Sequence, residues 1–153
     1  TCMAPYSCDA ELVGLMKQAG CALVIIGGNQ GDPHYSSSPD TRFELLLEVC
    51  RLCEDGGLHY TISQTFGEPG ETRETVEKKL AFLRKLKPAV TNLRVGVSIL
   101  PGSKVATLAL EEGLISEESE LIRPTFYLAA AVKPWIVDRL KAEADQHPRW
   151  NLV

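Results

Sequence analysis

Residues 67–75 read GEPGETRET and lie between an apolar, strand-like run and an amphipathic helix pattern. The glycines of this stretch let backbone amides approach a ligand closely and tolerate positive φ. Pro69 stiffens the turn, Thr72 is suited to cap the helix that follows, and Glu71 lies near the positive end of that helix. Taken alone, these residues favour a helix start and nothing more, so the flanking segments decide what the loop does.

The segments around this loop alternate between helix and strand patterns. We expect helices over residues 9–20, 39–57, 73–86, 104–112 and 134–146, a short helix at 117–121, and strands over 21–26, 58–66 and 92–100. Residues 21–26 are continuously apolar, which is typical of a strand buried on both faces of a parallel sheet. The order predicts βαβ units with parallel strands and outer helices.

These elements predict an α/β fold in the form of a partial TIM-type barrel of about three βα units. So few strands cannot close a (β/α)8 barrel, so they form an open half-barrel or are completed by another chain. By length the chain is a single domain over residues 1–153. Within it we expect a flexible start (1–8), the partial barrel (9–128), and a C-terminal helix and tail (129–153).

Composition excludes several kinds of partner. The net charge of −4 leaves no basic surface of the kind that binds nucleic acid. The apolar runs are far shorter than the ~20 residues that cross a bilayer, and no charged-then-apolar leader opens the chain. We therefore expect neither a membrane contact nor a secretory signal.

The cysteines favour a reducing cytoplasm. Their number is odd and several lie inside helix or strand patterns, which argues against a disulfide framework: Cys2, Cys8, Cys21, Cys50 and Cys53. Cys50 and Cys53 have CxxC spacing but lie late in a helix pattern, away from the helix start that activates a redox thiol. Cys2 and Cys8 are weak candidates for a metal site.

Polar loops follow each predicted strand, at residues 27–31, 67–72 and 101–103. In parallel α/β folds ligands bind at this edge, because the unpaired N–H groups of helix N-termini point there. Each of the three loops is therefore a candidate for ligand binding.

The joint pattern resembles the radical S-adenosylmethionine enzymes. The resemblance covers roughly residues 9–128, and its motifs are an Asp-x-Glu-Leu helix start at 9–12, Ala-Gly-Cys at 19–21, Gly-Asp-Pro at 31–33, GEPGET at 67–72, Pro-Gly-Ser at 101–103 and Glu-Gly-Leu-Ile at 112–115. The most similar subgroup is the one whose members often carry a cobalamin-binding domain. The resemblance implies that the three strands are the fourth to the sixth of a (β/α)6 partial barrel, in its C-terminal half.

The resemblance also implies a set of cofactor-binding residues. These are Gly27, Gly28, Asn29, Gln30, Gly67, Pro69, Gly70 and Ser98. The backbone of residues 67–70 would pack near the adenine, and the strand carrying Ser98 would line the pocket floor. Where the family commonly has Gly-x-Glu-Ser-Gly, this chain has GGNQG at 27–31, so Asn29 offers an acceptor without charge and Gln30 could take its place.

The family's cluster motif, CxxxCxxC, does not occur in this sequence. Three thiolates hold the [4Fe–4S] cluster that delivers an electron to S-adenosylmethionine. The resemblance therefore implies that the chain is part of a longer enzyme, that the N-terminal half of the barrel is its partner, and that it is inactive alone. The parent would use S-adenosylmethionine and a [4Fe–4S] cluster, with cobalamin as a further candidate, to form a 5′-deoxyadenosyl radical. No catalytic residue and no metal ligand can be named from the sequence.

Two other hypotheses stay open. In the first, the half-barrel is a stand-alone binding or assembly module that forms a homodimer, or pairs with another protein, through exposed strand edges. In the second, the chain is a phosphate-binding α/β enzyme that uses the 67–70 loop.

Overall fold

The computed structural model describes residues 2–27 and 39–153, and the side chains of all of these except residues 39–42. Its centre is a five-stranded sheet in the order β1 (Cys2–Met3), β2 (Leu23–Gly27), β3 (His59–Phe66), β4 (Val90–Val95) and β7 (Trp150–Leu152). Every neighbouring pair in this sheet is parallel. The predicted α/β fold with parallel strands is confirmed.

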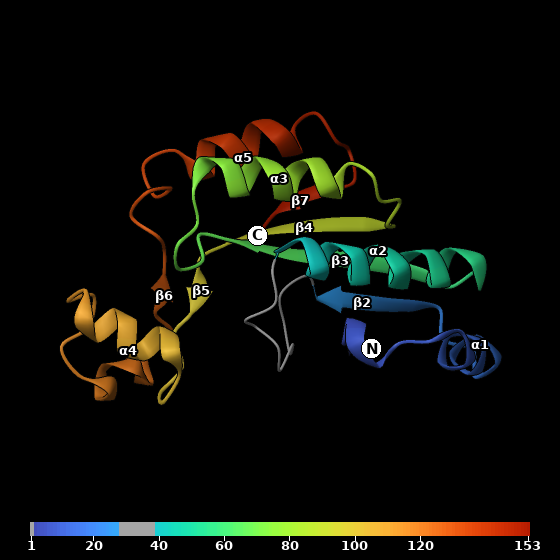
Figure 1. The fold of residues 1–153 in the computed structure, drawn as a ribbon, viewed down its shortest axis with the longest axis horizontal. Coiled ribbons are helices and arrows are strands. Elements are labelled where there is room, and N and C mark those ends of the chain that lie inside the picture. The colour runs from blue at the N-terminus through green and yellow to red at the C-terminus, as the bar shows by residue number, and fades with distance from the viewer. Residues whose placement is uncertain (1, 28–38) are drawn as a thin grey trace.

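Helices connect the strands of this sheet. They are α1 (Ala10–Gln18), α2 (Pro39–Asp55), α3 (Arg73–Leu83) and α5 (Ile136–Ala144), with a 3-10 turn η1 (Pro5–Ser7) after β1. Figure 1 shows α2, α3 and α5 packed along one face of the sheet, with the opposite face free of helices along its middle. Among the described residues, helices therefore cover one face of the sheet and leave much of the other face uncovered.

The core lies between the sheet and these helices. The strands contribute Val24, Ile26, Tyr60, Ile62, Phe66 and Leu93, and the helices contribute Leu46, Val49, Val76, Leu80, Leu83, Ile136 and Leu140. The helix residues recur at intervals of three and four, which places them on one stripe facing the sheet. The pattern that predicted helices from the sequence is thus the pattern that builds the core.

The open face corrects the expectation that residues 21–26 are buried on both sides. Leu23 and Ile25 are 41% and 43% exposed, whereas Val24 and Ile26 are fully buried. Alternate side chains of a strand point to opposite faces, and here only one face carries helices. On the same face, Thr61 of β3 is buried, Ser63, Thr65 and Asn92 are half-buried and Arg94 is exposed, so among the described residues part of this face is accessible.

The predicted strand over residues 92–100 is wrong, because it is two strands in different sheets. β4 ends at Val95, and β5 (Val97–Ser98) pairs antiparallel with β6 (Phe126–Tyr127) in a separate two-stranded sheet. The break is Gly96, which has φ +84°, and a Cβ there would lie 3.2 Å from the carbonyl oxygen of Tyr127. Only glycine adopts this conformation freely, so the chain leaves the parallel sheet at that residue.

Beyond this break the chain forms a lobe at one end of the sheet. It contains β5, β6, α4 (Lys104–Glu111) and a 3-10 helix η2 (Glu118–Ile122), as Figure 1 shows. Ser103 caps α4 by accepting a hydrogen bond from the Ala106 amide at 3.1 Å. The helix predicted at 104–112 is confirmed, and the short one predicted at 117–121 is of the 3-10 type.

Both ends of the described chain belong to the sheet. The start, expected to be flexible over residues 1–8, contains β1 at one edge, with Met3 buried. The tail after α5 contains β7 at the other edge, where Asn151 pairs with Asn92. No helix in the described ranges is long and apolar enough to cross a membrane.

Candidate functional site

A pocket of about 550 Å³ is lined by residues of the sheet's open face. Its lining combines residues of β1 to β4 with the β4–β5 turn, β6 and the last residue: Cys2, Ile25, Gly27, Ser63, Thr65, Asn92, Arg94, Val95, Gly96, Phe126 and Val153. Its volume is in the range of sites for small organic ligands and cofactors. The pocket lies toward the carboxyl ends of the strands, where parallel α/β folds bind ligands.

The strand register explains why these residues meet. Ser63 is paired with Gly27 on one side and with Asn92 on the other, and Thr65 is paired with Arg94. Paired residues of a parallel sheet point to the same face, so the pairs form two adjacent polar rows on the open side. The floor of the pocket is therefore made of hydroxyl, amide and guanidinium groups.

Apolar groups frame this polar floor. Ile25, Phe126 and Val153 come from β2, β6 and the end of the chain. A few polar groups inside a mostly apolar frame are typical of sites that bind and orient an organic molecule. Among the described residues of the lining, Arg94 has the only charged side chain, and no ion pair joins it to another of them.

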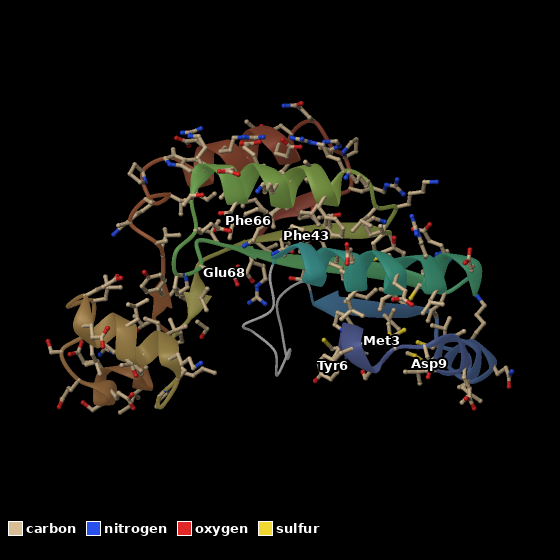
Figure 2. All side chains as sticks on the ribbon, in the orientation of Figure 1. Met3, Tyr6, Asp9, Phe43, Phe66 and Glu68 are labelled. Carbon is tan, nitrogen blue, oxygen red and sulfur yellow. The ribbon has the colours of Figure 1, made fainter. Side chains whose placement is uncertain are left out.

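Next to the pocket, the loop after β3 is folded around a buried lysine. Lys79 of α3 is 8% exposed and lies between Glu68 and Glu71, which are 8% and 4% exposed. The Lys79 Nζ atom is 2.5 Å from Glu68 Oε2, is ion-paired with Glu71, and donates to the Thr65 carbonyl at 3.0 Å. Figure 2 marks Phe66 and Glu68, where β3 ends and this loop begins.

The backbone amide and carbonyl of Gly67 are both hydrogen-bonded to other residues of the protein. Its amide donates to the Glu71 carboxylate, and its carbonyl accepts from the Ala129 amide at 2.9 Å. A carboxylate of the chain thus already occupies the position that an anion would take at this loop. This geometry argues against the hypothesis of a phosphate site at residues 67–70.

The helix start after the loop is built as predicted. Thr75 donates its amide to Thr72 Oγ1 at 3.3 Å, and Thr72 donates its amide to Thr75 Oγ1 at 2.9 Å. This reciprocal pair satisfies donors that the first turn of a helix leaves free. The cap and the lysine together hold the loop in one shape.

The structure places the predicted cofactor-binding residues in three different settings. Gly27 lines the pocket, whereas Gly28, Asn29 and Gln30 lie outside the described residues. Gly67 is buried against Leu128, and the adjacent Pro69 and Gly70 are exposed in the loop. Ser98 is exposed in β5 and is not part of the pocket lining. Their contacts with a cofactor remain predictions.

The polar floor was missed from the sequence, although a signal was present. Ser63, Thr65, Asn92 and Arg94 alternate with buried residues in β3 and β4. A polar residue at every second position of an inner strand indicates a solvent- or ligand-facing side. Lys79 also had a signal, because it occupies a position on the apolar stripe of α3 next to Leu80.

The described residues contain no group of three or more His, Cys, Asp or Glu side chains that could hold a metal. Burial raises the pKa of the Cys50 thiol to about 12 and that of Cys53 to about 11. Both thiols are therefore protonated at neutral pH in the metal-free protein.

In sequence the chain resembles the radical S-adenosylmethionine enzymes, and its fold matches part of their barrel. It is 29% identical over 116 residues to tryptophan 2-C-methyltransferase of Streptomyces laurentii, an alignment that covers 71% of this chain and 19% of that protein. No protein-family model matches the chain.

Two solved structures of TsrM from Kitasatospora setae, a radical S-adenosylmethionine methyltransferase, give TM-scores of 0.78 and 0.77 at 20% identity. Each match covers the whole of this chain and 38% of the solved chain. One holds tryptophan and a S-adenosylmethionine analogue, and the other holds cobalamin and a [4Fe–4S] cluster. The predicted resemblance, including that to the cobalamin-using subgroup, is confirmed, and this chain spans only a part of the proteins it matches.

Proposed function

We propose that this chain is one part of the barrel of a radical S-adenosylmethionine enzyme and that its open-face pocket binds S-adenosylmethionine. The observation that carries the proposal is the pocket's position at the carboxyl ends of β2, β3 and β4, with Gly27, Thr65 and Gly96 around it. The likeness to methyltransferases supports the same assignment.

The lining suits the chemistry of that cofactor. Ser63, Thr65 and Asn92 offer hydroxyl and amide groups for a ribose and an amino-acid end, and Phe126 offers an aromatic surface for an adenine. Gly67 has no free backbone group, so its contribution is the close packing that a side chain would prevent. These residues would bind and orient the cofactor rather than exchange protons with it.

We further propose that a [4Fe–4S] cluster comes from a part of the protein outside residues 1–153, in the N-terminal half of the barrel. In radical enzymes of this kind the cluster supplies the electron that cleaves S-adenosylmethionine. The sequence lacks the CxxxCxxC motif, and for that reason we expect residues 1–153 alone to be inactive in this reaction. Methyl transfer with cobalamin is the reaction class that the relatives support.

The binding proposal can be tested with S-adenosylhomocysteine and the isotope-labelled chain. NMR titration should shift the amide signals of residues 63–65 and 92–96. Thr65→Trp fills the pocket and should abolish the shifts, whereas Thr107→Trp on the exposed side of α4 should not. Shifts that are absent in the wild type, or that survive Thr65→Trp unchanged, would contradict the proposal.

A second candidate function follows from the exposure of Leu23 and Ile25 on the open face and from the two-residue edge strand β1. We infer that this surface also serves as an assembly interface, with the rest of a barrel or with a second copy of the chain. Light scattering should show association that Ile25→Glu disrupts and that Ile122→Glu, on the separate lobe, leaves intact. A wild type that is monomeric at every concentration would rule out self-assembly.

A further inference from the structure

The chain leaves the sheet for the lobe and returns from it at two places that meet at one peptide. At the β4–β5 turn, the Gly96 amide donates a hydrogen bond to the Phe66 carbonyl at 2.8 Å. After β6, the Ala129 amide donates to the Gly67 carbonyl at 2.9 Å, and Leu128 packs so closely on Gly67 that a Cβ there would have no room. The lobe is therefore attached to the sheet at Phe66 and Gly67, where β3 ends; Figure 2 marks Phe66.

The buried ammonium group of Lys79 acts on this same point of the backbone. It donates to the Thr65 carbonyl at 3.0 Å and lies 5.4 Å from the centre of the Phe66 ring. It also pairs with the Glu71 carboxylate, which accepts a hydrogen bond from the Gly67 amide. Three consecutive residues at the end of β3 thus depend on one cation.

The contacts of this cation leave it little freedom. An ammonium has three N–H donors, and three oxygens surround this one, from the Thr65 carbonyl and from the carboxylates of Glu68 and Glu71. Because Lys79 is only 8% exposed, water cannot readily replace an oxygen that moves away. A shift of residues 65–67 would leave a buried donor without its acceptor, which is costly. The cluster therefore holds the attachment point of the lobe in one place.

The position of the lobe matters for the pocket, because two of the lining residues lie on the lobe side of it. Gly96 of the β4–β5 turn and Phe126 of β6 form this wall, whereas Ser63 and Thr65 belong to the floor on β3. Floor and wall come from segments that are distant in the sequence. Their spacing is therefore set where the lobe meets the sheet.

We propose that Lys79 is a positioning residue, whose ammonium holds the lobe against the sheet and so places the pocket wall formed by Gly96 and Phe126. The proposal deepens the proposed function and rests on it, because this pocket is the proposed S-adenosylmethionine site. Lys79 does not itself line the pocket, so its effect on a ligand is indirect.

Residual dipolar couplings of the backbone amides test the positioning without a ligand. In weakly aligned wild-type protein, one alignment tensor should fit the couplings of the sheet and of the lobe, because the two tumble as one body. In Lys79→Met the lobe should give a smaller tensor than the sheet, since its attachment point is no longer fixed. A lysine that only stabilised the fold would leave the couplings unchanged, because they are measured on folded molecules.

Two further variants control this measurement. Lys78→Met removes the neighbouring lysine, whose side chain is exposed, and should keep one common tensor. If Lys79→Met does not fold, the double variant Lys79→Met with Glu68→Gln decides, because it also lacks the ammonium but has one buried carboxylate fewer. A common tensor for lobe and sheet without Lys79, or unequal tensors already in the wild type, overturns the proposal.

Titration with S-adenosylhomocysteine tests the link to the ligand. Lys79→Met should bind this probe roughly 2- to 10-fold more weakly than wild type, the range expected when an aromatic contact is misplaced, and Lys78→Met should bind it as wild type does. A loosened lobe with unchanged affinity would overturn the role of this wall in the cofactor site. Absence of binding to the wild type would contradict the proposed function, whereas the dipolar couplings would still decide whether Lys79 positions the lobe.

Discussion

Arginines on the two faces of the sheet differ in their partners. On the covered face, Glu143 of α5 is 2% exposed and accepts hydrogen bonds from Arg84 at 2.6 and 2.7 Å and from Arg139 at 2.8 Å. Arg139 in turn holds both oxygens of Glu77 of α3. On the open face, Arg94 has no such partner among the described residues.

This difference separates charges that hold the fold from charges that are free to act. The pairs of the covered face join α3 to α5, and α5 leads directly into β7 at the sheet edge. Removing one member of a buried pair leaves its partner uncompensated, which costs stability. An exposed cation with no ion-pair partner among the described residues costs little stability to remove, and it is available to bind a ligand.

The largest effect is expected at Lys79. Lys79→Met removes the cation that Glu68 and Glu71 share in a buried setting, and should lower the free energy of unfolding by about 3–5 kcal/mol in urea titration. Lys78→Met is the matched control, because the Lys78 side chain is exposed and its ion pair with Glu74 lies at the surface. That control should change stability by less than about 1 kcal/mol.

The double variant Lys79→Met with Glu68→Gln sharpens this result. Neutralising Glu68 should recover part of the loss, since it removes the repulsion between two neighbouring buried carboxylates that have lost Lys79. A Lys79→Met protein as stable as Lys78→Met would show that the buried ion pairs do not hold the loop.

A smaller loss is expected at the seam between α3 and α5. Glu143→Gln keeps the shape of the side chain but removes the charge that binds Arg84 and Arg139, and should cost about 2 kcal/mol. Glu48→Gln, on the exposed side of α2, should stay within about 0.5 kcal/mol of wild type. Equal losses of stability in Glu143→Gln and Glu48→Gln would show that the ion pairs between α3 and α5 do not stabilise the fold.

The same seam predicts a pH dependence. Hydrogen bonds from Arg84 and then Arg139 lower the pKa of Glu143 to about 2, below its ordinary range. A pKa depressed in the folded state stabilises the protein above the unfolded pKa of about 4.3, and this contribution disappears as pH falls toward 2. The stability difference between wild type and Glu143→Gln should therefore be full near pH 6 and shrink below about pH 4. A difference that is constant from pH 6 to pH 2 would contradict this.

Much of the fold could be predicted because its signals are local. Asp9 accepts from the Leu12 amide at 2.7 Å and Thr72 forms its capping box, so both helix starts fall where cap residues predict them. The helices continue as long as their apolar stripes do. The inner strand β3 lies within the predicted range because it is long enough for its pattern to be recognised.

The rest depends on contacts between distant segments. β1 and β7 have two and three residues, too few for a pattern, and they exist because β2 and β4 offer pairing edges. Apolar residues alternate regularly through residues 92–100, so the sequence pattern does not reveal that Gly96, with its positive φ, ends one strand and precedes another. The open face could not be predicted from β2 alone, because it depends on which side the helices pack. For the same reason the sequence named Gly27 but not Arg94 as a pocket residue.

The smallest effect on stability, and the sharpest check of the comparison, is expected at Arg94. Arg94→Gln removes a charge that has no partner in the described part of the chain, so the free energy of unfolding should change by less than about 0.5 kcal/mol. Urea titration of Arg94→Gln and Glu143→Gln under the same conditions would compare the free energies of unfolding that the two faces contribute. A loss near that of Glu143→Gln would mean that Arg94 is tied into the fold and is not available to a ligand. A negligible loss is the result that a cation free to bind a ligand requires.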